Sequence, residues 1–316
     1  MRIVTTLPSA TETVAALDLE PAAVSHECDH PPGIESLPSV TASRIDTDGS
    51  SAEIDSQVLE TADDGGVYDV DTELLAELDP ELIVTQGMCD VCAVDETVIT
   101  EAVDALDTNP EILTTDPHRV SDVLDDLERV GHATGREKRA SEVRADLESR
   151  IDAIQARTAD LKADDRPRVA IFDWTDPAMI AGHWTADLVE WAGGTYGLAD
   201  AGERSRPREW EEIREYDPEL VIVAPCGFGL EQVAANAADL TDREGWDELT
   251  AVENGRVWAM DGDHYLNRPG PRLVDTLEAL APIVQPDIFD EETPPESLSE
   301  IAVPFETLLD RLEADA

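Results

Sequence analysis

Histidine and cysteine side chains that could bind a metal lie at two places in the first third of the sequence. His26, Cys28 and His30 share one short turn, and Cys89-x-x-Cys92 follows a later apolar run. Imidazole and thiolate are ligands that zinc prefers, so these groups could form a zinc site, with Cys28, Cys89 and Cys92 as its thiols. A redox role for the Cys89–Cys92 pair is a second interpretation. The third interpretation is that these thiols are inert or face a ligand.

Catalytic signatures are missing from the sequence. It contains no G-x-S-x-G, no phosphate-binding loop and no G-x-G-x-x-G. No catalytic residues are therefore assigned, and the expectation of a binding protein and not an enzyme rests on the resemblance described below.

Polar and aromatic residues follow most of the expected strands, which is where ligands of open α/β sheets bind. These segments are 8–9, 26–30, 43–44, 86–92, 174–176, 182–184, 226–228 and 261–268. Two of the six tryptophans, Trp174 and Trp184, fall in this set. They suit an apolar wall for a large flat ligand, or else they belong to the core.

The pattern of apolar runs predicts alternating strands and helices. Strands are expected at 2–7, 24–25, 81–85, 111–115, 168–173, 219–224 and 256–260. Helices are expected between them, the first opened by a capping box at Ser9–Glu12 and running through Leu19. Because the strands read as continuous apolar runs, the alternation indicates parallel sheets in an α/β fold.

A long helix is expected near the middle of the chain, over residues 136–164. The segment has no proline, and its apolar residues recur at the spacing of one helix face. With α/β-like sequence on both sides, the segment is interpreted as a strut between two lobes.

An internal repeat supports two related lobes. Residues 75–84 and 213–222 each read as a helix, a D-P-E-L turn and an apolar strand, 138 residues apart. We therefore expect an N-terminal lobe at 1–134, a linking helix at 135–165, a C-terminal lobe at 166–284 and an acidic, proline-rich tail at 285–316. The last helix of this tail, near 305–314, is expected to pack loosely or to be an appendix.

The charge of the chain excludes several partners. Its 72 acidic and 22 basic residues give a formal net charge of −50 over 316 residues. Nucleic acid is therefore not an expected partner, and an anionic membrane would repel the chain. Acidic composition with only two lysines is similar to that of halophilic archaeal proteins. No apolar stretch is long enough for insertion into a membrane, and no leader is visible, so the sequence as written predicts a cytoplasmic location.

Four segments resemble the cobalamin-binding branch of the helical-backbone substrate-binding proteins, the partners of vitamin B12 and siderophore ABC importers. They are 7–12 (LPSATE), 25–31 (SHECDHP), 79–84 (DPELIV) and 268–272 (RPGPR). The resemblance covers roughly residues 1–284. It implies two Rossmann-like lobes joined by one long rigid helix, a ligand in the cleft between them, an ABC permease as partner, a monomer, and a place on the extracellular face of the membrane.

A corrinoid is a large flat ring edged with amides, which calls for aromatic walls and scattered hydrogen-bonding groups. On the resemblance, the expected ligand-binding residues are Ser43, Arg44, Gln86, Met88, Trp174, His183, Trp184, His264, Tyr265 and Asn267. Members of the family dock the permease through one acid on each lobe, for which Glu211 and Glu96 are the candidates. No cofactor is expected, since the corrinoid would be the ligand itself.

Two other functions stay open at this point. One is an intracellular metal- or thiol-dependent protein on the same fold, because ordinary corrinoid capture does not need the cysteines. The other is a siderophore- or haem-binding protein. The scarcity of cations argues against anionic chelates, so we rank it below the corrinoid.

Overall fold

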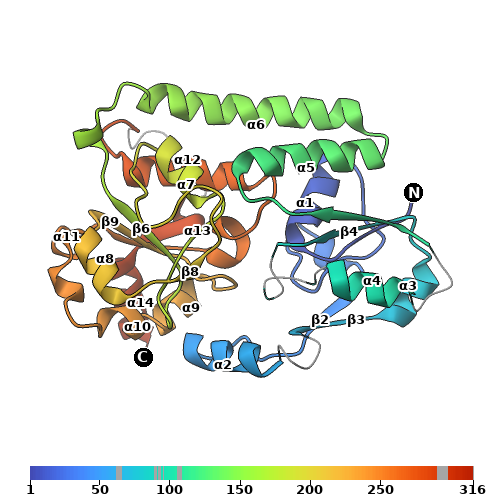
Figure 1. The fold of residues 1–316 in the computed structure, drawn as a ribbon, viewed down its shortest axis with the longest axis horizontal. Coiled ribbons are helices and arrows are strands. Elements are labelled where there is room, and N and C mark those ends of the chain that lie inside the picture. The colour runs from blue at the N-terminus through green and yellow to red at the C-terminus, as the bar shows by residue number, and fades with distance from the viewer. Residues whose placement is uncertain are drawn as a thin grey trace.

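The computed structural model describes residues 1–61, 66–88, 91, 94, 96–104, 109–289 and 298–315, the side chains of 311–315 excepted. It contains two α/β lobes, with one long helix, α6 (Glu137–Thr158), lying along one side of both (Figure 1). The predicted fold class is confirmed.

The N-terminal lobe is built on three parallel strands in the order β1-β4-β5. They are β1 (Ile3–Thr5), β4 (Leu82–Gln86) and β5 (Glu111–Thr115), and every residue of β4 is buried, as expected for a central parallel strand. Helices α1 (Pro8–Ala16), α3 (Thr72–Leu78), α4 (Glu96–Asp104) and α5 (Val120–Ala133) belong to this lobe. A hairpin, β2 (Thr41–Ser43) with β3 (Tyr68–Val70), carries helix α2 (Ser51–Thr61) on its connection.

The C-terminal lobe is built on a six-stranded sheet in the order β11-β10-β9-β6-β7-β8. Its parallel centre is β6 (Val169–Trp174), β9 (Leu220–Val223) and β10 (Val257–Met260), and its antiparallel strands are β7 (Met179–Ile180), β8 (Arg206–Pro207) and β11 (Ala302–Pro304). Its helices are α7 (Thr185–Trp191), α8 (Trp210–Tyr216), α9 (Leu230–Ala235), α10 (Ala238–Thr241), α11 (Thr250–Glu253), α12 (Leu273–Val284), α13 (Leu298–Ile301) and α14 (Phe305–Asp315).

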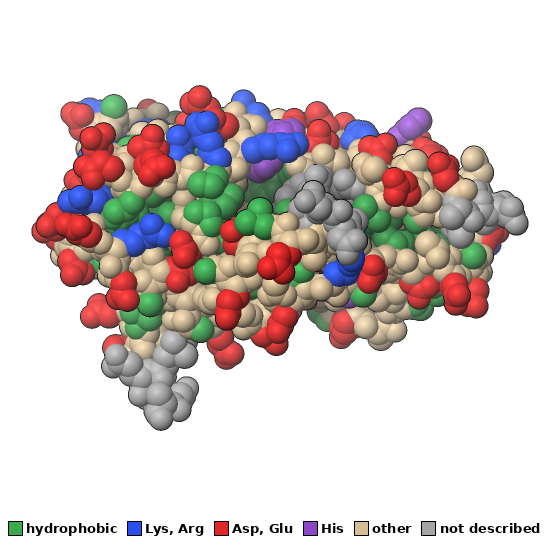
Figure 2. All heavy atoms as spheres, turned by 60° about the horizontal axis from the view of Figure 1, so that its bottom comes forward, with side chains coloured by type: hydrophobic (Ala, Val, Ile, Leu, Met, Phe, Trp, Pro, Cys, Tyr) green, Lys and Arg blue, Asp and Glu red, His purple; other side chains and the backbone are tan. Residues whose placement is uncertain are grey.

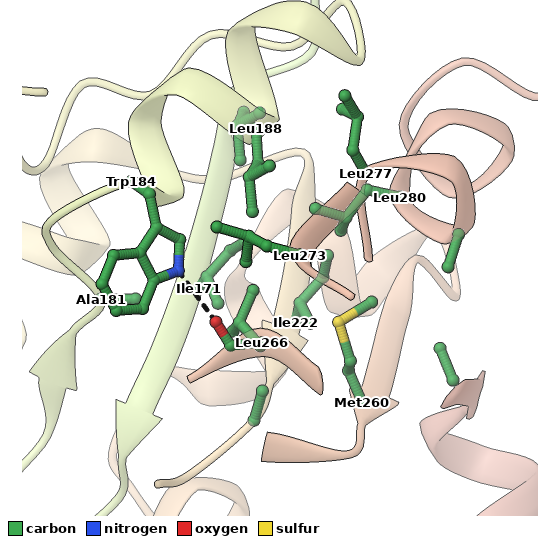
Figure 3. Packing of buried hydrophobic residues seen from close by; sticks show 14 of the residues in the cluster. Ile171, Ala181, Trp184, Leu188, Ile222, Met260, Leu266, Leu273, Leu277 and Leu280 are labelled. Carbon is green, nitrogen blue, oxygen red and sulfur yellow. Dashed lines mark hydrogen bonds between the residues drawn. The ribbon is translucent and has the colours of Figure 1, made fainter. Parts of the chain in front are cut away.

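The core of this lobe lies where the central strands meet α7 and α12. Figure 3 shows Ile171 and Ile222 from the sheet packed among leucines of the two helices, with Trp184 at the edge of the cluster. The indole nitrogen of Trp184 donates to the carbonyl oxygen of Leu266 at 2.9 Å. A buried tryptophan with its polar atom satisfied inside the protein is a packing residue.

Helix α6 is shorter than predicted. It ends at Thr158 and not at residue 164, so its 22 residues span about 33 Å. The hydroxyl of Thr158 donates to the carbonyl oxygen of Trp191 at 2.9 Å, and Arg166 donates to the carbonyl oxygen of Thr158 at 3.1 Å. These contacts turn the chain into the C-terminal lobe. Arg150 fixes α6 to α12 through Glu278 at 2.8 Å.

The internal repeat extends to backbone geometry. Helices α3 and α8 each have seven residues and lie 138 positions apart, as do the starts of β4 and β9. Each helix ends on an aspartate in the left-handed conformation, Asp79 with φ 45° and Asp217 with φ 47°. A non-glycine residue with positive φ is uncommon, so two at equivalent positions show that the turns are the same structure.

An arginine braces each of these turns in the same way. Arg2 precedes β1, and its Nε donates to the carbonyl oxygen of Asp79 at 2.8 Å. Arg168 precedes β6, and its Nε donates to the carbonyl oxygen of Asp217 at 2.9 Å. The carboxylate of each aspartate also accepts from its arginine, at 2.9 Å and 3.4 Å. The two lobes therefore share this arginine–aspartate contact as well as the order of their parallel strands.

The expectation that the C-terminal tail packs loosely is wrong. Strand β11 adds to the edge of the large sheet, antiparallel to β10, with Ala259 opposite Val303. Ile301, Phe305 and Leu308 are buried in the lobe's core. The sequence signal for this burial is the apolar run at 301–303, followed by Phe305 and Leu308.

The predicted capping box at Ser9–Glu12 is also wrong. Helix α1 begins at Pro8, its N-cap is Leu7, and no side chain caps it. Proline is well suited to the first turn, where its missing N–H costs nothing. The Glu12 carboxylate is used elsewhere, against Arg272 of the other lobe.

Within the described residues, no helix is both long enough and apolar enough to cross a membrane.

Candidate ligand-binding site

Three of the four sequence motifs meet where the lobes touch. Glu12 from α1 and Asp29 from the following loop face Arg268 and Arg272, which precede α12. We call these four residues the lobe junction. Arg272 donates to Glu12 at 2.6 and 2.9 Å and to Asp29 at 3.0 and 3.1 Å. Arg268 forms a further ion pair with Asp29.

The junction is closely packed, and three of its four side chains are largely buried. The side chains of Glu12, Arg268 and Arg272 are only 2%, 8% and 11% exposed. A Cβ atom on Gly270, between the two arginines, would lie 2.8 Å from the Glu12 carboxylate and 3.3 Å from the Cα of Ser9. The RPGPR motif therefore lets the two backbones approach closely.

Burial dominates the electrostatics of Glu12. Desolvation raises the pKa of Glu12, and the Arg272 guanidinium opposes that shift without cancelling it. Oε2 of Glu12 has no hydrogen-bond partner in the described part of the chain. A carboxylate in such a place depends on its arginine, because an unpaired charge in low dielectric is costly.

Further acids surround the junction. Nδ1 of His264 lies 2.9 Å from the Asp261 carboxylate, and this hydrogen bond raises the pKa of His264. Arg268 donates to Asp263 at 3.0 Å and to the carbonyl oxygen of Glu27 at 3.2 Å. Both arginines are thus fully engaged with acceptors, and this region carries more carboxylates than cations.

Glu27 gives the region a pH dependence near neutrality. Burial, with a smaller contribution from Asp263, raises its pKa to about 7. Because this pKa is raised in the folded protein, the stability that neutral Glu27 contributes is complete below about pH 4.5 and is lost as the pH rises through about 7.

We therefore expect Glu27→Gln to stabilise the protein at about pH 8 and to change little at about pH 5. Urea unfolding followed by tryptophan fluorescence at both pH values measures this, with exposed Glu20→Gln as the matched control. A midpoint that does not move at the higher pH would contradict the shift.

A second contact between the lobes joins the N-terminus of α5 to α7. The Arg119 guanidinium pairs with Asp187, whose side chain is 2% exposed, and the Val120 N–H donates to the same carboxylate at 3.2 Å. The ring centroids of His118 and His183, one from each lobe, lie 5.2 Å apart. The lobes are therefore in contact at a second place besides the lobe junction.

His183 has unusual local geometry. Its φ is 53°, a left-handed value that is strained for a histidine. Burial lowers its pKa to about 4, with His118 and Arg204 adding to the shift, so the imidazole is neutral at neutral pH. Nδ1 has no partner among the described residues. A neutral imidazole at a lobe interface can accept a hydrogen bond or bind a metal.

The N-terminal candidates fall in two places. Ser43 and Arg44 lie at the root of the β2–β3 hairpin, where the Ser43 hydroxyl donates to the carbonyl oxygen of Ile45 and Arg44 donates to that of Gly66. Gln86 and Met88 are 1% and 8% exposed, and Gln86 accepts from the Met88 N–H at 2.7 Å. The structure therefore places the second pair in the interior.

The C-terminal candidates divide in the same way. Trp184 is a core residue, 4% exposed, so its indole packs inside the lobe. Trp174 is partly exposed at the end of β6, against Phe228. Tyr265 lies under the Arg272 guanidinium, 5.3 Å from ring centroid to Cζ. Asn267 donates to the carbonyl oxygens of Ala224 and Gly262, which holds the loop after β10.

The cysteine candidates are only partly described. Cys28 is 5% exposed, and burial raises the pKa of its thiol to about 11. A thiol with so high a pKa is a poor nucleophile and a poor metal ligand. Cys89 and Cys92 lie outside the described residues. Among the described ones, no three histidine, cysteine or acidic side chains are placed to hold a metal ion.

The two docking candidates lie on outer surfaces. Glu211 is in the first turn of α8 and lines a hollow of about 310 Å³ with Arg214 and Glu248. Glu96 is in the first turn of α4, beside a hollow of about 850 Å³. These helices are not equivalent in the repeat. The residue equivalent to Glu211 is Glu73, exposed in the first turn of α3.

A family model described as periplasmic binding protein matches residues 3–264. The chain belongs to the periplasmic binding protein family. It is therefore a substrate-binding protein of the kind that serves ABC transporters, and the known members of the family are solute-binding proteins.

Individual relatives are distant. An uncharacterized ABC transporter substrate-binding lipoprotein, YvrC of Bacillus subtilis, is 26% identical over 72% of this chain and 68% of its own length. A vitamin B12-binding protein of Vibrio cholerae is 24% identical over 50% of this chain, a match that spans only 54% of that relative.

Solved structures share the fold at about one-fifth identity. The periplasmic vitamin B12-binding protein BtuF of Vibrio cholerae has a TM-score of 0.65 at 21% identity, covering 90% of this chain and 96% of that one. A periplasmic heme-binding protein from Pseudomonas aeruginosa has a TM-score of 0.69 at 21% identity, covering 93% and 95%.

Two features of the structure are absent from the predictions made from sequence. The first is the lobe junction. Its four residues lie in the sequence motifs, but nothing in the sequence shows that these distant arginines and acids pair. Glu73 is also absent from these predictions, although the 138-residue offset of the repeat places it at the position equivalent to Glu211.

Proposed function

We propose that this protein binds cobalamin or a related corrinoid between its lobes and delivers it to an ABC importer. The observation that carries the proposal is the charge of the lobe interface. Arg268 and Arg272 are each paired with carboxylates, and Asp261 and Asp263 add further carboxylates beside them.

This charge pattern selects among ligands of similar size. Haem carries two carboxylates and many ferric chelates are anionic, so both call for free cations in the site. A corrinoid has amides at its rim, which require hydrogen-bonding groups, and a flat ring, which requires apolar walls. Partly exposed Trp174 and Tyr265 suit such walls.

One observation favours haem or another iron chelate. His118 and His183 face each other from opposite lobes, and neutral imidazole is a good ligand for iron. The alternative therefore belongs in the same experiment.

The test is a titration of the purified protein with cyanocobalamin and, separately, with hemin, in molar salt, followed by tryptophan quenching. We expect cyanocobalamin to bind more tightly than about 10 µM, which corresponds to about 7 kcal/mol. Trp174→Phe should reduce the quenching, while the matched core variant Trp184→Phe should not. Tight binding of hemin alone would replace the corrinoid assignment, and binding of neither would overturn it.

We propose Glu211 and Glu73 as the pair that meets the permease. They occupy equivalent places on the two lobes, so a two-fold permease would meet the same feature twice. We expect Glu73→Lys with Glu211→Lys to weaken permease binding about tenfold or more, about 1.4 kcal/mol, with ligand affinity unchanged. Pull-down with the reconstituted importer measures this, and Glu96→Lys is the control of the same charge. A larger loss with Glu96→Lys would assign docking to α4.

A further inference from the structure

The connection between β2 and β3 leaves the N-terminal lobe and reaches the other lobe. Its root is the antiparallel hairpin, where the Arg44 N–H donates to the carbonyl oxygen of Val67 at 2.8 Å. Its far end is α2, which lies beside the C-terminal lobe on the side of the molecule opposite α6 (Figure 1). We call residues 44–61 the strap.

Polar contacts fasten the strap to α9 and α10. The Ser51 N–H donates to the side-chain oxygen of Asn236 at 3.1 Å, and the Ser51 hydroxyl donates to Asp239. The Thr175 hydroxyl bonds to the same serine at 3.1 Å and to the same carboxylate at 2.8 Å. Ser51 is fully buried by these contacts although it sits at a helix N-terminus.

A second contact holds the turn before α2. The amide of Gln232 donates to the carbonyl oxygen of Thr47 at 2.7 Å. Asp239 also lies at the positive end of the α2 dipole, which favours a carboxylate there. Beyond Ser51, the buried residue of α2 is Ile54.

An attachment with these contacts can open, so that α2 separates from the C-terminal lobe. An 11-residue helix is marginal on its own, so α2 depends on the lobe that it touches. Its attachment combines these hydrogen bonds, which water can replace at small net cost, with one buried apolar side chain, Ile54, and the partly buried Ile45 and Val58. Local elements with few buried apolar contacts open before the rest of a protein does.

The other contacts between the lobes are not of a kind that opens in this way. Helix α6 joins the lobes on one side, and two sets of ion pairs hold them together: the buried lobe junction, and the pair of half-exposed Arg119 with buried Asp187. The strap closes the opposite side. Figure 2, in which the bottom of Figure 1 comes forward, shows the surface hollowed near the middle of this face, with hydrophobic, histidine and basic side chains at the rim.

We propose that the strap must detach from α9 and α10 for a large ligand to enter or leave the space between the lobes, while the lobes themselves stay in place. The ligand part of this proposal rests on the proposed function. The attachment of the strap does not, so the two can fail separately.

The test opens the strap with Ser51→Glu, which puts a second carboxylate against Asp239. Ser56→Glu is the matched control, the same substitution at an exposed position of the same helix. Gln232→Ala, on the receiving lobe, is a milder variant that leaves the buried contacts in place.

Hydrogen exchange by mass spectrometry in molar salt decides whether the strap is attached. In the wild type, α2 should be protected, and Ser51→Glu should speed its exchange about tenfold or more while the peptides of β9 and α12 are unchanged. Gln232→Ala should give a smaller increase, and Ser56→Glu none. Fast exchange of α2 in the wild type, or equal exchange in the two glutamate variants, would overturn the proposal.

Stopped-flow mixing with cyanocobalamin and with hemin decides whether the strap controls entry. Ser51→Glu should raise both the association and the dissociation rate of the ligand that binds by about tenfold. Unchanged rates with an open strap would overturn the gating role. If neither probe binds the wild type, the proposed function fails, and the exchange result alone decides on the strap.

Discussion

Replacing Arg272 with methionine is expected to lower the free energy of unfolding by about 3–5 kcal/mol, because Glu12 would remain buried without its cation. The side chain of Glu12 is 2% exposed and accepts two hydrogen bonds from this guanidinium. Urea unfolding in molar salt, followed by tryptophan fluorescence, measures the loss. It should shrink as the pH falls, since the pKa of Glu12 is already raised and protonation removes the unpaired charge.

Two variants show whether the loss comes from the buried charge. In the double variant Glu12→Gln with Arg272→Met the charge is absent, so most of the stability should return. Arg144→Met is the surface control, because Arg144 pairs with acids that are themselves 48–62% exposed. We expect it to cost under about 1 kcal/mol. A loss of the same size at Arg144 and Arg272 would mean that the junction is no stronger than a surface ion pair.

Replacing Phe305 with alanine is expected to cost about 3–5 kcal/mol, as for other buried phenylalanines. The ring is 4% exposed and follows β11 directly, so the substitution leaves a cavity beneath the end of the sheet. Removing residues 298–316 should cost more. It also uncovers the edge of β10, and an exposed edge strand promotes aggregation.

Glu306→Ala is the matched control for Phe305→Ala, since Glu306 is the exposed neighbour on the same helix. It should change stability by less than about 0.5 kcal/mol. Light scattering during refolding reports on aggregation of the shortened chain. A shortened chain that unfolds at the same urea concentration as the full chain, and stays monomeric, would restore the view of the tail as an appendix.

The fold was accessible from sequence because it is encoded locally. Apolar runs such as 82–86 and 220–223 each predict a buried strand by themselves, and the amphipathic period over 136–158 predicts one helix. The repeated D-P-E-L turn placed two of the strands in equivalent surroundings. The predicted helix extends beyond the observed end of α6, because a tertiary contact of Thr158 with the C-terminal lobe ends the helix.

The candidate site was less accessible because its contacts are not local. Arg272 and Glu12 are 260 positions apart, and Ser51 and Asp239 are 188 apart. In a chain with 72 acidic residues, no sequence pattern shows which of them will pair with a given arginine. Trp174 and Trp184 show the same limit. Both follow strands in the sequence, and only packing separates the partly exposed ring from the core ring.

The position of β11 has a consequence for synthesis of the chain. The sheet of the N-terminal lobe is complete once β5 ends at Thr115, so that lobe can fold while the ribosome is still making α6. The second sheet has to wait for residues 302–304, which follow the end of β10 at Met260 by about 40 residues. Until then β10 offers an unpaired edge in a crowded cytoplasm. The nascent C-terminal lobe is therefore open to edge-to-edge association during synthesis, and a translational pause between β10 and β11 would prolong that exposure.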